Sequence, residues 1–281
     1  MARVLITGGA GFLGAHLIRD CILRGDEVVV LARPTSAIWR LHDVLPRIVL
    51  HRVHSLDIQE MGRLIRETRP ERVFHLAATT RFRPRPGMAE LNHAIVANVE
   101  PLQILLDTLR QLDEPPLAVV RAGTLAELGQ SGTPHGPHSR EQPEDAYGLS
   151  ALIGTNMIRL SRGEMDLPAV TARLGLTYGG DQSSDFLIPQ MIRQGLEGSL
   201  PVLRNPRARR DLLHVDDTIA ALQIVADHAG SLPDTVAVST GKPVPMSTVG
   251  TMIARLLGLP LPARPRQTAY DDVMPTLSCR P

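Results

Sequence analysis

The chain is poor in cysteine, in lysine and in long apolar runs. Its two cysteines, Cys21 and Cys279, lie far apart, which argues against a disulfide framework and for a reducing compartment. Lys242 is the single lysine among 30 basic residues. The excess of arginine suits phosphate ligands but also fits a GC-rich genome.

These shortages exclude several classes of protein. No apolar run reaches the ~18 residues of a membrane span. The first three residues lead straight into an apolar segment, so we expect no signal peptide and a cytoplasmic location. A net charge of +1 gives no general attraction to nucleic acid.

Short apolar segments alternate with helical patterns along 281 residues, of which 43% are hydrophobic. This alternation predicts an α/β fold with a Rossmann-type, doubly wound parallel sheet. We expect residues 1–175, with a return segment at about 210–240, to form an NADP(H)-binding domain. Residues 176–281, which are rich in glycine and proline, are expected to form mainly a smaller substrate-capping region. Strands are predicted over 4–6, 28–31, 48–53, 73–76, 117–120 and 169–172, and helices over 12–23, 59–67, 88–112 and 144–162.

A glycine-rich turn follows the first predicted strand. Gly8 allows a tight turn, Gly11 lets the backbone approach a pyrophosphate, and Gly14 lets the following helix lie close to the strand. The amide groups of Phe12 and Leu13 open that helix and point toward the phosphate position. A glycine pattern alone is weak, but its strand-to-helix context predicts a dinucleotide site.

The end of the second strand indicates which nicotinamide cofactor is bound. An acidic residue there would bind the ribose hydroxyls of NAD, but this chain has Ala32 and Arg33. Arg33 could pair with a 2′-phosphate, helped by Thr35 or Ser36. NADP(H) is therefore preferred and NAD(H) stays open, since Arg33 could also be a solvated loop residue.

A second candidate cofactor contact follows the third strand. Asp57, with Ile58 beside it, could accept a hydrogen bond from the adenine amino group. Asp57 is equally well placed to cap a helix.

Several motifs together resemble the extended short-chain dehydrogenases/reductases, the family of NAD-dependent epimerases and dehydratases. The motifs are TGGAGFLG at 7–14, HLAA at 75–78, Asn98, YGLS at 147–150, RLG at 173–175 and RDLLHVDD at 210–217. The segment 269–279 is similar to that of dTDP-sugar 4-ketoreductases.

The resemblance implies hydride transfer to or from a nucleotide-linked sugar, with Tyr147 moving the proton and Thr124 bonding the reacting oxygen. Either residue taken alone would more often be structural. The resemblance also places Leu76, Ala77, Ala78 and Asn98 at the cofactor, with Asn98 bracing the backbone. Arg81 and Arg210, together with Thr124, are the expected substrate contacts, although either arginine could be merely solvated. Many relatives are homodimers, and the stretches 88–112 and 144–162 are candidates for such an interface.

One position departs from the family pattern. A lysine normally follows the tyrosine by four residues, where it holds the nicotinamide ribose and lowers the tyrosine pKa, but this chain has Ala151. Without that lysine, the pKa of Tyr147 is expected near the ordinary value of about 10. The protonated phenol suits ketone reduction better than alcohol oxidation. An epimerase, a non-catalytic NADP(H)-binding protein and an inactivated variant stay open.

Other departures narrow the reaction and the substrate pose. The family's dehydratases carry an Asp-Glu pair after the threonine, where this chain has Leu125 and Ala126, so the sequence argues against dehydration. Glu127 is expected to point elsewhere. Leu176 stands where relatives often place an asparagine that touches the diphosphate. The sequence thus favours an NADPH-dependent reductase of a keto-deoxysugar, most simply one linked to dTDP.

No metal site is expected. The His51/His54 and His135/His138 pairs lack further ligands at suitable spacing. The acidic pair Asp216 and Asp217 is interpreted as the cap of the helix that follows.

Overall fold

A computed structural model describes residues 1–281 except 55, 82–87, 130–134, 137–138, 262–275 and 278–281. Most of the tail similar to 4-ketoreductases, including Cys279, therefore lies outside the described residues. Cys21 is buried and makes no disulfide. In the described part of the chain, no helix is long and apolar enough to cross a membrane.

The centre of the molecule is a seven-stranded parallel sheet in the order β10-β6-β5-β4-β1-β2-β3. Its strands are mostly short and apolar, as expected when helices cover both faces. The chain first builds outward from β1 through β2 to β3, and then crosses to β4 on the other side of β1. The seven strands have the bounds Arg3–Thr7 (β1), Glu27–Ala32 (β2), Ile48–Arg52 (β3), Arg72–His75 (β4), Ala118–Thr124 (β5), Ala169–Leu174 (β6) and Thr235–Val238 (β10).

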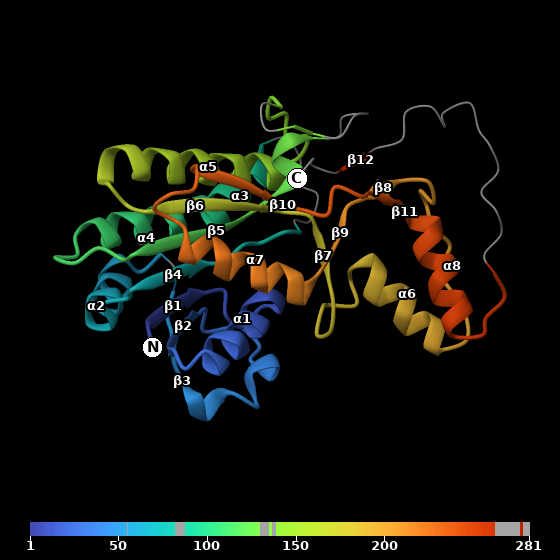
Figure 1. The fold of residues 1–281 in the computed structure, drawn as a ribbon, viewed down its shortest axis with the longest axis horizontal. Helices are drawn as coiled ribbons and strands as arrows, with labels where there is room; N and C mark the ends of the chain where they lie inside the picture. Colours follow the sequence, from blue (N-terminus) through green and yellow to red (C-terminus); the bar gives the residue numbers. More distant parts are fainter. Residues whose placement is uncertain (55, 82–87, 130–134, 137–138, 262–275, 278–281) are drawn as a thin grey trace.

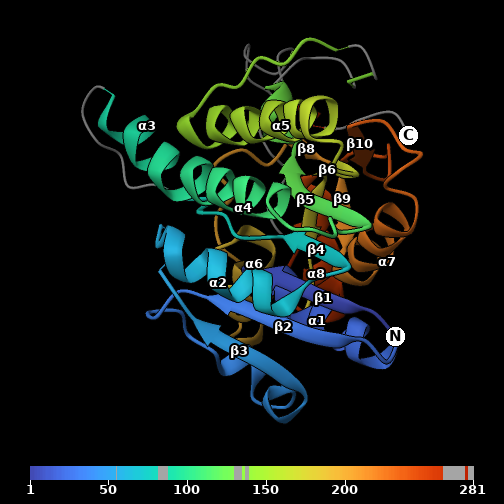
Figure 2. The same cartoon turned by 90° about the vertical axis from the view of Figure 1, so that its left-hand side faces the viewer.

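Helices cover the two faces of this sheet (Figures 1 and 2). One core contains α1 (Phe12–Leu23) and α7 (Val215–Asp227), and includes Leu17, Val30 and Leu222. The other core, which includes Leu5, Leu64 and Leu105, lies under the helices of the opposite face. Those helices are α2 (Ile58–Thr68), α4 (Glu100–Arg110) and α5 (Ala146–Met165). The predicted doubly wound Rossmann-type fold is confirmed.

The stretch predicted as one helix over 88–112 is interrupted. It consists of α3 (Ala89–Ala94), one π-helical turn (Ile95–Val99) and α4. Pro101 stands in the first turn of α4. Proline has no backbone N–H, and this position tolerates that loss because an N–H there would have no acceptor within α4. Such π-turns occur often at functional sites, and this one carries Asn98.

A smaller lobe extends from the end of the sheet, to the right in Figure 1. Two helices, α6 (Leu187–Leu196) and α8 (Met246–Leu256), pack through Ile188, Met191 and Ile253. Small sheets accompany them, with bounds Leu176–Tyr178 (β7), Arg209–Arg210 (β8), Leu212–His214 (β9), Val244–Pro245 (β11) and Thr276–Leu277 (β12). Between these segments the chain returns to the large sheet through α7 and β10.

The glycine turn between β1 and α1 has the geometry expected of it. Gly8 has a φ of +74°, and a Cβ there would lie 2.6 Å from the Ala77 nitrogen. A Cβ on Gly14 would lie 2.4 Å from the Gly8 carbonyl oxygen. Only glycine therefore lets α1 and the segment after β4 approach the end of β1 so closely.

Replacing Gly14 by alanine should destabilise the fold, because the new methyl group meets backbone atoms that cannot rotate away. We expect a loss of about 1–3 kcal/mol in the free energy of unfolding, measured by urea titration. The matched control is Gly163→Ala in α5, where a Cβ meets nothing within 4 Å. That change should be neutral or stabilise by up to about 1 kcal/mol. Equal effects at both positions would contradict the steric argument.

Candidate active site and cofactor cleft

A cavity of about 400 Å³ opens at the carboxyl ends of β1, β2 and β4. This is the point where the strand order reverses, the usual ligand site of open α/β sheets. Its lining includes two residues of the glycine turn, Gly8 and Gly11, and the segment after β4 formed by Leu76, Ala77, Ala78 and Thr79. Phe12 and Leu13 follow as the first residues of α1, whose N-cap is Gly11. The structure thus brings the predicted pyrophosphate-binding residues together.

The far end of this cavity, beyond β2, is cationic. Arg33, Thr35 and Ser36 line it as the sequence predicts, and Arg40 joins them. The Arg40 guanidinium lies 4.2 Å from the centre of the Trp39 ring, and its Nε donates to the Asp181 carbonyl oxygen at 2.8 Å. Of the described residues, no aspartate or glutamate lines the cavity.

Sequence reasoning missed Arg40. It follows Arg33 in the same loop, so the signal was a second arginine shortly after the end of a strand. No pattern in that loop shows that it turns back toward the cavity.

Asp57 has the second of its two predicted roles. Its side chain accepts from the Glu60 amide at 3.0 Å and caps α2. Neither Asp57 nor the exposed Ile58 is among the residues that line the cavity. An adenine contact of these two residues stays a prediction.

Tyr147 lines a small hollow that shares His75, Ala77 and Ala78 with this cavity, and Thr124 is hydrogen-bonded to Tyr147. Asp145 caps α5 by accepting from the Gly148 amide at 2.6 Å, which sets Tyr147 in the first helical turn. Thr124 ends β5 and accepts from the Ala126 amide at 3.2 Å. Burial raises the pKa of Tyr147 above its ordinary value, although a hydrogen bond with Thr124 opposes this effect. The expectation of an ordinary pKa is corrected: desolvation makes the phenol a weaker acid.

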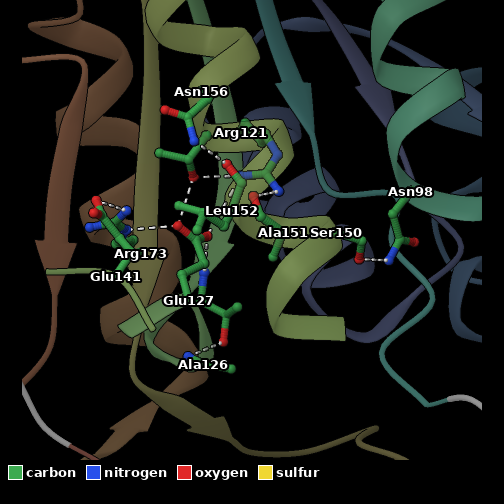
Figure 3. Close-up of polar contacts among 12 residues, drawn as sticks. Asn98, Arg121, Ala126, Glu127, Glu141, Ser150, Ala151, Leu152, Asn156 and Arg173 are labelled. Atoms are coloured by element: carbon green, nitrogen blue, oxygen red, sulfur yellow. Dashed lines mark hydrogen bonds and ion pairs between the residues drawn. The ribbon is translucent and has the colours of Figure 1, made fainter. Parts of the chain in front are cut away.

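Asn98 connects the tyrosine helix to the wall of the cleft. Its side-chain oxygen accepts from the Thr79 amide at 2.7 Å, and its nitrogen donates to the Thr79 carbonyl oxygen and the Ser150 hydroxyl, both at 3.0 Å. Figure 3 shows the bond to Ser150. Asn98 also lines a small hollow of about 10 Å³ together with Tyr147 and Ala151. These bonds agree with a bracing role.

A buried charge network surrounds Glu127 (Figure 3). Glu127 is fully buried, and its carboxylate lies 2.7 Å from Arg173 Nε and 3.8 Å from an Arg121 nitrogen. A terminal nitrogen of Arg173 pairs with Glu141 at 2.9 Å. Glu127 also accepts from the Thr124 amide at 3.1 Å. Glu127 therefore points into the protein, as the sequence suggests, while the role of Arg121 was missed.

The two predicted substrate arginines lie in different places. Arg81 donates to the Asp185 carbonyl oxygen and lies over the Phe186 ring at 4.4 Å. Arg210 is in β8 of the smaller lobe, where burial lowers its pKa and its side chain donates to the Arg209 carbonyl oxygen at 2.9 Å. Leu176 opens β7 and is partly exposed. Contacts of these arginines with a substrate stay predictions.

Among the described residues, no group of three or more His, Cys, Asp and Glu side chains could hold a metal ion. His138 lies outside the described residues, whereas the buried His135 bonds the Gly129 carbonyl oxygen. The expected cap at Asp216 or Asp217 is wrong. Helix α7 begins earlier, at Val215, and His214 caps it by accepting from the Asp216 amide at 3.3 Å.

His75, the last residue of β4, is held neutral inside the cleft. It is 4% exposed, and its Nδ1 lies 2.9 Å from the Thr7 hydroxyl. Burial, with the nearby Arg121 charge, lowers the pKa of His75 to about 3. An unfolded histidine titrates near about 6.5, so between these values only the unfolded chain binds the proton.

This histidine should make stability depend on pH. The stabilisation that comes from holding His75 neutral is complete above about pH 6.5. It falls as the pH drops toward 3, and the free energy of unfolding is lower by about 2 kcal/mol at pH 5. His75→Gln can keep a hydrogen bond to Thr7 and should flatten that dependence, measured by urea unfolding at several pH values. His54→Gln, at an exposed position, serves as the control. A wild-type slope in His75→Gln would rule this histidine out as the cause.

Comparison with known proteins agrees with this architecture. A model described as the NAD dependent epimerase/dehydratase family matches residues 4–239. A dTDP-glucose 4,6-dehydratase of Neisseria gonorrhoeae is 28% identical over 295 residues, covering 99% of this chain and 85% of that protein. The UDP-glucose 4-epimerase of Thermus thermophilus, solved with NAD, has a TM-score of 0.82 and 24% identity, covering 99% of this chain and 90% of that one.

A second solved structure, WbmG of Bordetella bronchiseptica in complex with NAD and UDP, has the same TM-score of 0.82. It is 23% identical and covers 100% of this chain and 85% of its own. Because both identities are below 25%, the two solved structures support the fold and nothing beyond it. The family model spans most of the chain, and the chain therefore belongs to the NAD-dependent epimerase/dehydratase family of extended short-chain dehydrogenases/reductases.

Proposed function

We propose that the protein reduces a keto group on a nucleotide-linked deoxysugar with NADPH, and that Tyr147 donates the proton. The observation that carries this proposal is the environment of Tyr147. Burial raises its pKa, Thr124 bonds its side chain, and alanine stands where the family has lysine. Burial and the absence of the lysine favour a phenol that keeps its proton at neutral pH, and the bond with Thr124 opposes this rise in pKa without cancelling it.

The proposed direction of reaction follows from that proton. A reduced nicotinamide bound in the cleft would supply the hydride, and Tyr147 would give its proton to the carbonyl oxygen. Thr124 would hydrogen-bond the same oxygen. An epimerase needs the tyrosine as a base in its first step, which a raised pKa disfavours.

Dehydration is disfavoured by the residues after Thr124. Leu125 is almost fully buried and Ala126 carries no acid or base. Glu127, the next carboxylate, is fully buried and bound to two arginines. The similarity to dTDP-glucose 4,6-dehydratases therefore extends to the scaffold but not to the acid–base pair that eliminates water.

The cleft fits a dinucleotide with an additional phosphate. Gly8 and Gly11 line the cavity without side chains, which leaves the glycine turn open to a pyrophosphate. Arg33 and Arg40 would hold the 2′-phosphate, with Thr35 and Ser36 as hydroxyl donors. Leu76, Ala77 and Ala78 would line the path of the cofactor toward Tyr147 and Asn98.

The substrate would lie between the sheet and the smaller lobe. Arg81 and Arg210 are the side chains proposed to contact its sugar and diphosphate. Relatives named for dTDP-glucose and UDP-glucose suggest a dTDP- or UDP-linked sugar as the substrate class.

Replacing Tyr147 by phenylalanine should lower single-turnover reduction by about 10²–10⁴-fold while NADPH binds as before, because only the proton donor is lost. The measurement is NADPH absorbance with a panel of dTDP- and UDP-linked 4-keto sugars. Tyr178→Phe is the matched control, since Tyr178 packs on His214 in the smaller lobe at a ring distance of 5.4 Å.

Three results would contradict this proposal. Tight NADPH binding without reduction of any keto sugar would indicate a non-catalytic cofactor-binding protein. Interconversion of sugar epimers with tightly held NAD would indicate an epimerase. Full activity in Tyr147→Phe would remove the proposed proton donor.

Cofactor choice can be tested separately. Arg33→Ala and Arg40→Ala should each weaken NADPH binding about 10–100-fold, since each removes a charged hydrogen bond worth ~1.5–3 kcal/mol. NADH binding should change little, as measured by calorimetry. Arg110→Ala, at the exposed end of α4, is the control. Tighter binding of NADH than NADPH by the unchanged protein would overturn the preference.

A further inference from the structure

We propose that Arg121 is a positioning residue that supplies, from β5, the positive charge that is missing at position 151, and that it acts through Tyr147. This inference rests on the proposed role of Tyr147 as proton donor. Arg121 would then do more than balance the buried charge of Glu127, because it would also act on the Tyr147 hydroxyl.

The guanidinium of Arg121 reaches across from the sheet to the tyrosine helix. One of its terminal nitrogens donates to the Ala151 carbonyl oxygen at 2.9 Å, and the second terminal nitrogen donates to the Thr155 hydroxyl at 3.2 Å. Arg121, Ala151 and Tyr147 line the same small hollow. In Figure 3 the Arg121 side chain points toward the helix turn that carries Ala151. The cation therefore lies at the residue where relatives have lysine.

Small residues on α5 make room for this arrangement. A Cβ on Gly154 would lie 2.6 Å from the Arg121 guanidinium carbon. Ala151 is buried beside the hollow of about 10 Å³, which has no space for a second long side chain. The small residues at positions 151 and 154 thus leave the space that the Arg121 side chain occupies.

Arg121 is fixed in place and charged. It is 5% exposed, and the Glu127 carboxylate lies 3.8 Å away. Thr155 accepts from Arg121 and donates to the other Glu127 oxygen at 2.7 Å, so the three side chains are linked. Burial lowers the pKa of Arg121 while Glu127 raises it. An arginine in such a pair keeps its proton at physiological pH.

Several groups act on the Tyr147 hydroxyl from the surrounding elements. Burial raises its pKa, as do the charges of Glu127 and Asp145. Thr124, through its hydrogen bond, and Arg121, through its charge, lower it. His75, on β4, lines the same hollow and is neutral above about pH 3. Among the described groups named here, Arg121 is the cation that stabilises the tyrosinate.

The test is the pKa of Tyr147 in Arg121→Met, measured without cofactor. The chain has three tyrosines, so [ζ-¹³C]tyrosine NMR gives few signals, and Tyr147→Phe identifies the relevant one. Loss of a nearby positive charge should raise that pKa by about one unit or more. The alkaline limb of the reductase pH profile should move upward by the same amount.

Matched variants separate charge from structure. Arg121→Lys keeps the charge and should leave the pKa near its original value. Arg159→Met removes an exposed arginine from α5, where it pairs with Asp234, and should cause no shift. The double variant Arg121→Ala/Ala151→Lys, in which the shortened residue 121 frees space for the lysine, places the charge on the helix and should bring the pKa back down.

The outcomes are distinct. A Tyr147 pKa that stays within about 0.3 units in folded Arg121→Met, well short of the shift that a lost neighbouring charge causes, would overturn the proposal and leave Arg121 a structural residue. Since Glu127 keeps its pair with Arg173, Arg121→Met should fold. If it does not, Arg121→Gln, which retains amide donors without the charge, gives the same readout. Failure of the proposed function would show in Tyr147→Phe kinetics, which do not enter this measurement.

Discussion

The end of the sheet that carries Thr124 depends on one carboxylate, Glu127, that is completely removed from water. A buried ion needs close compensation, because desolvation costs several kcal/mol per charge. Glu127 receives it from two arginines, a threonine hydroxyl and the Thr124 amide. These contacts tie β5 and β6 to α5, and thereby fix the positions of Thr124 and Tyr147 relative to each other.

The cleft is electrostatically divided along its length. At the β2 end it presents Arg33 and Arg40, without a carboxylate among the described lining residues. The small hollow that shares His75, Ala77 and Ala78 with this cavity holds a neutral histidine, a phenol whose pKa is raised and a buried arginine that is already paired. A ligand with a highly charged tail and an uncharged reacting group matches this division.

Much of the fold was predictable because strand and helix periodicity dominate in the nucleotide-binding half. The six predicted strands and the glycine turn all recur in the structure. The small sheets of the second lobe were not predicted, since β8 and β11 have two residues each and leave no periodic signal. The cap of α7 was assigned to the acidic pair because aspartate is the commoner cap, but helix α7 starts before it.

Candidate site residues that belong to sequence motifs could be predicted. Residues that reach the site only through tertiary contacts could not. The family motifs pointed to Tyr147, Thr124 and Asn98, and the structure brings Tyr147 close to both, while their roles stay predictions. Arg40 and Arg121 were missed, because loop curvature and cross-strand distance cannot be read from spacing. A charged residue inside a buried strand is rarely unpaired, so Arg121 followed by Glu127 was the available hint.

The close approach of Gly154 to the Arg121 guanidinium has a consequence for recognising related chains. With arginine at position 121, a methyl group at position 154 would lie 2.6 Å from the guanidinium carbon and would force the guanidinium to shift. Arginine at position 121 together with glycine at position 154 would therefore mark a separate branch of the family. Genome sequences alone would suffice to identify its members.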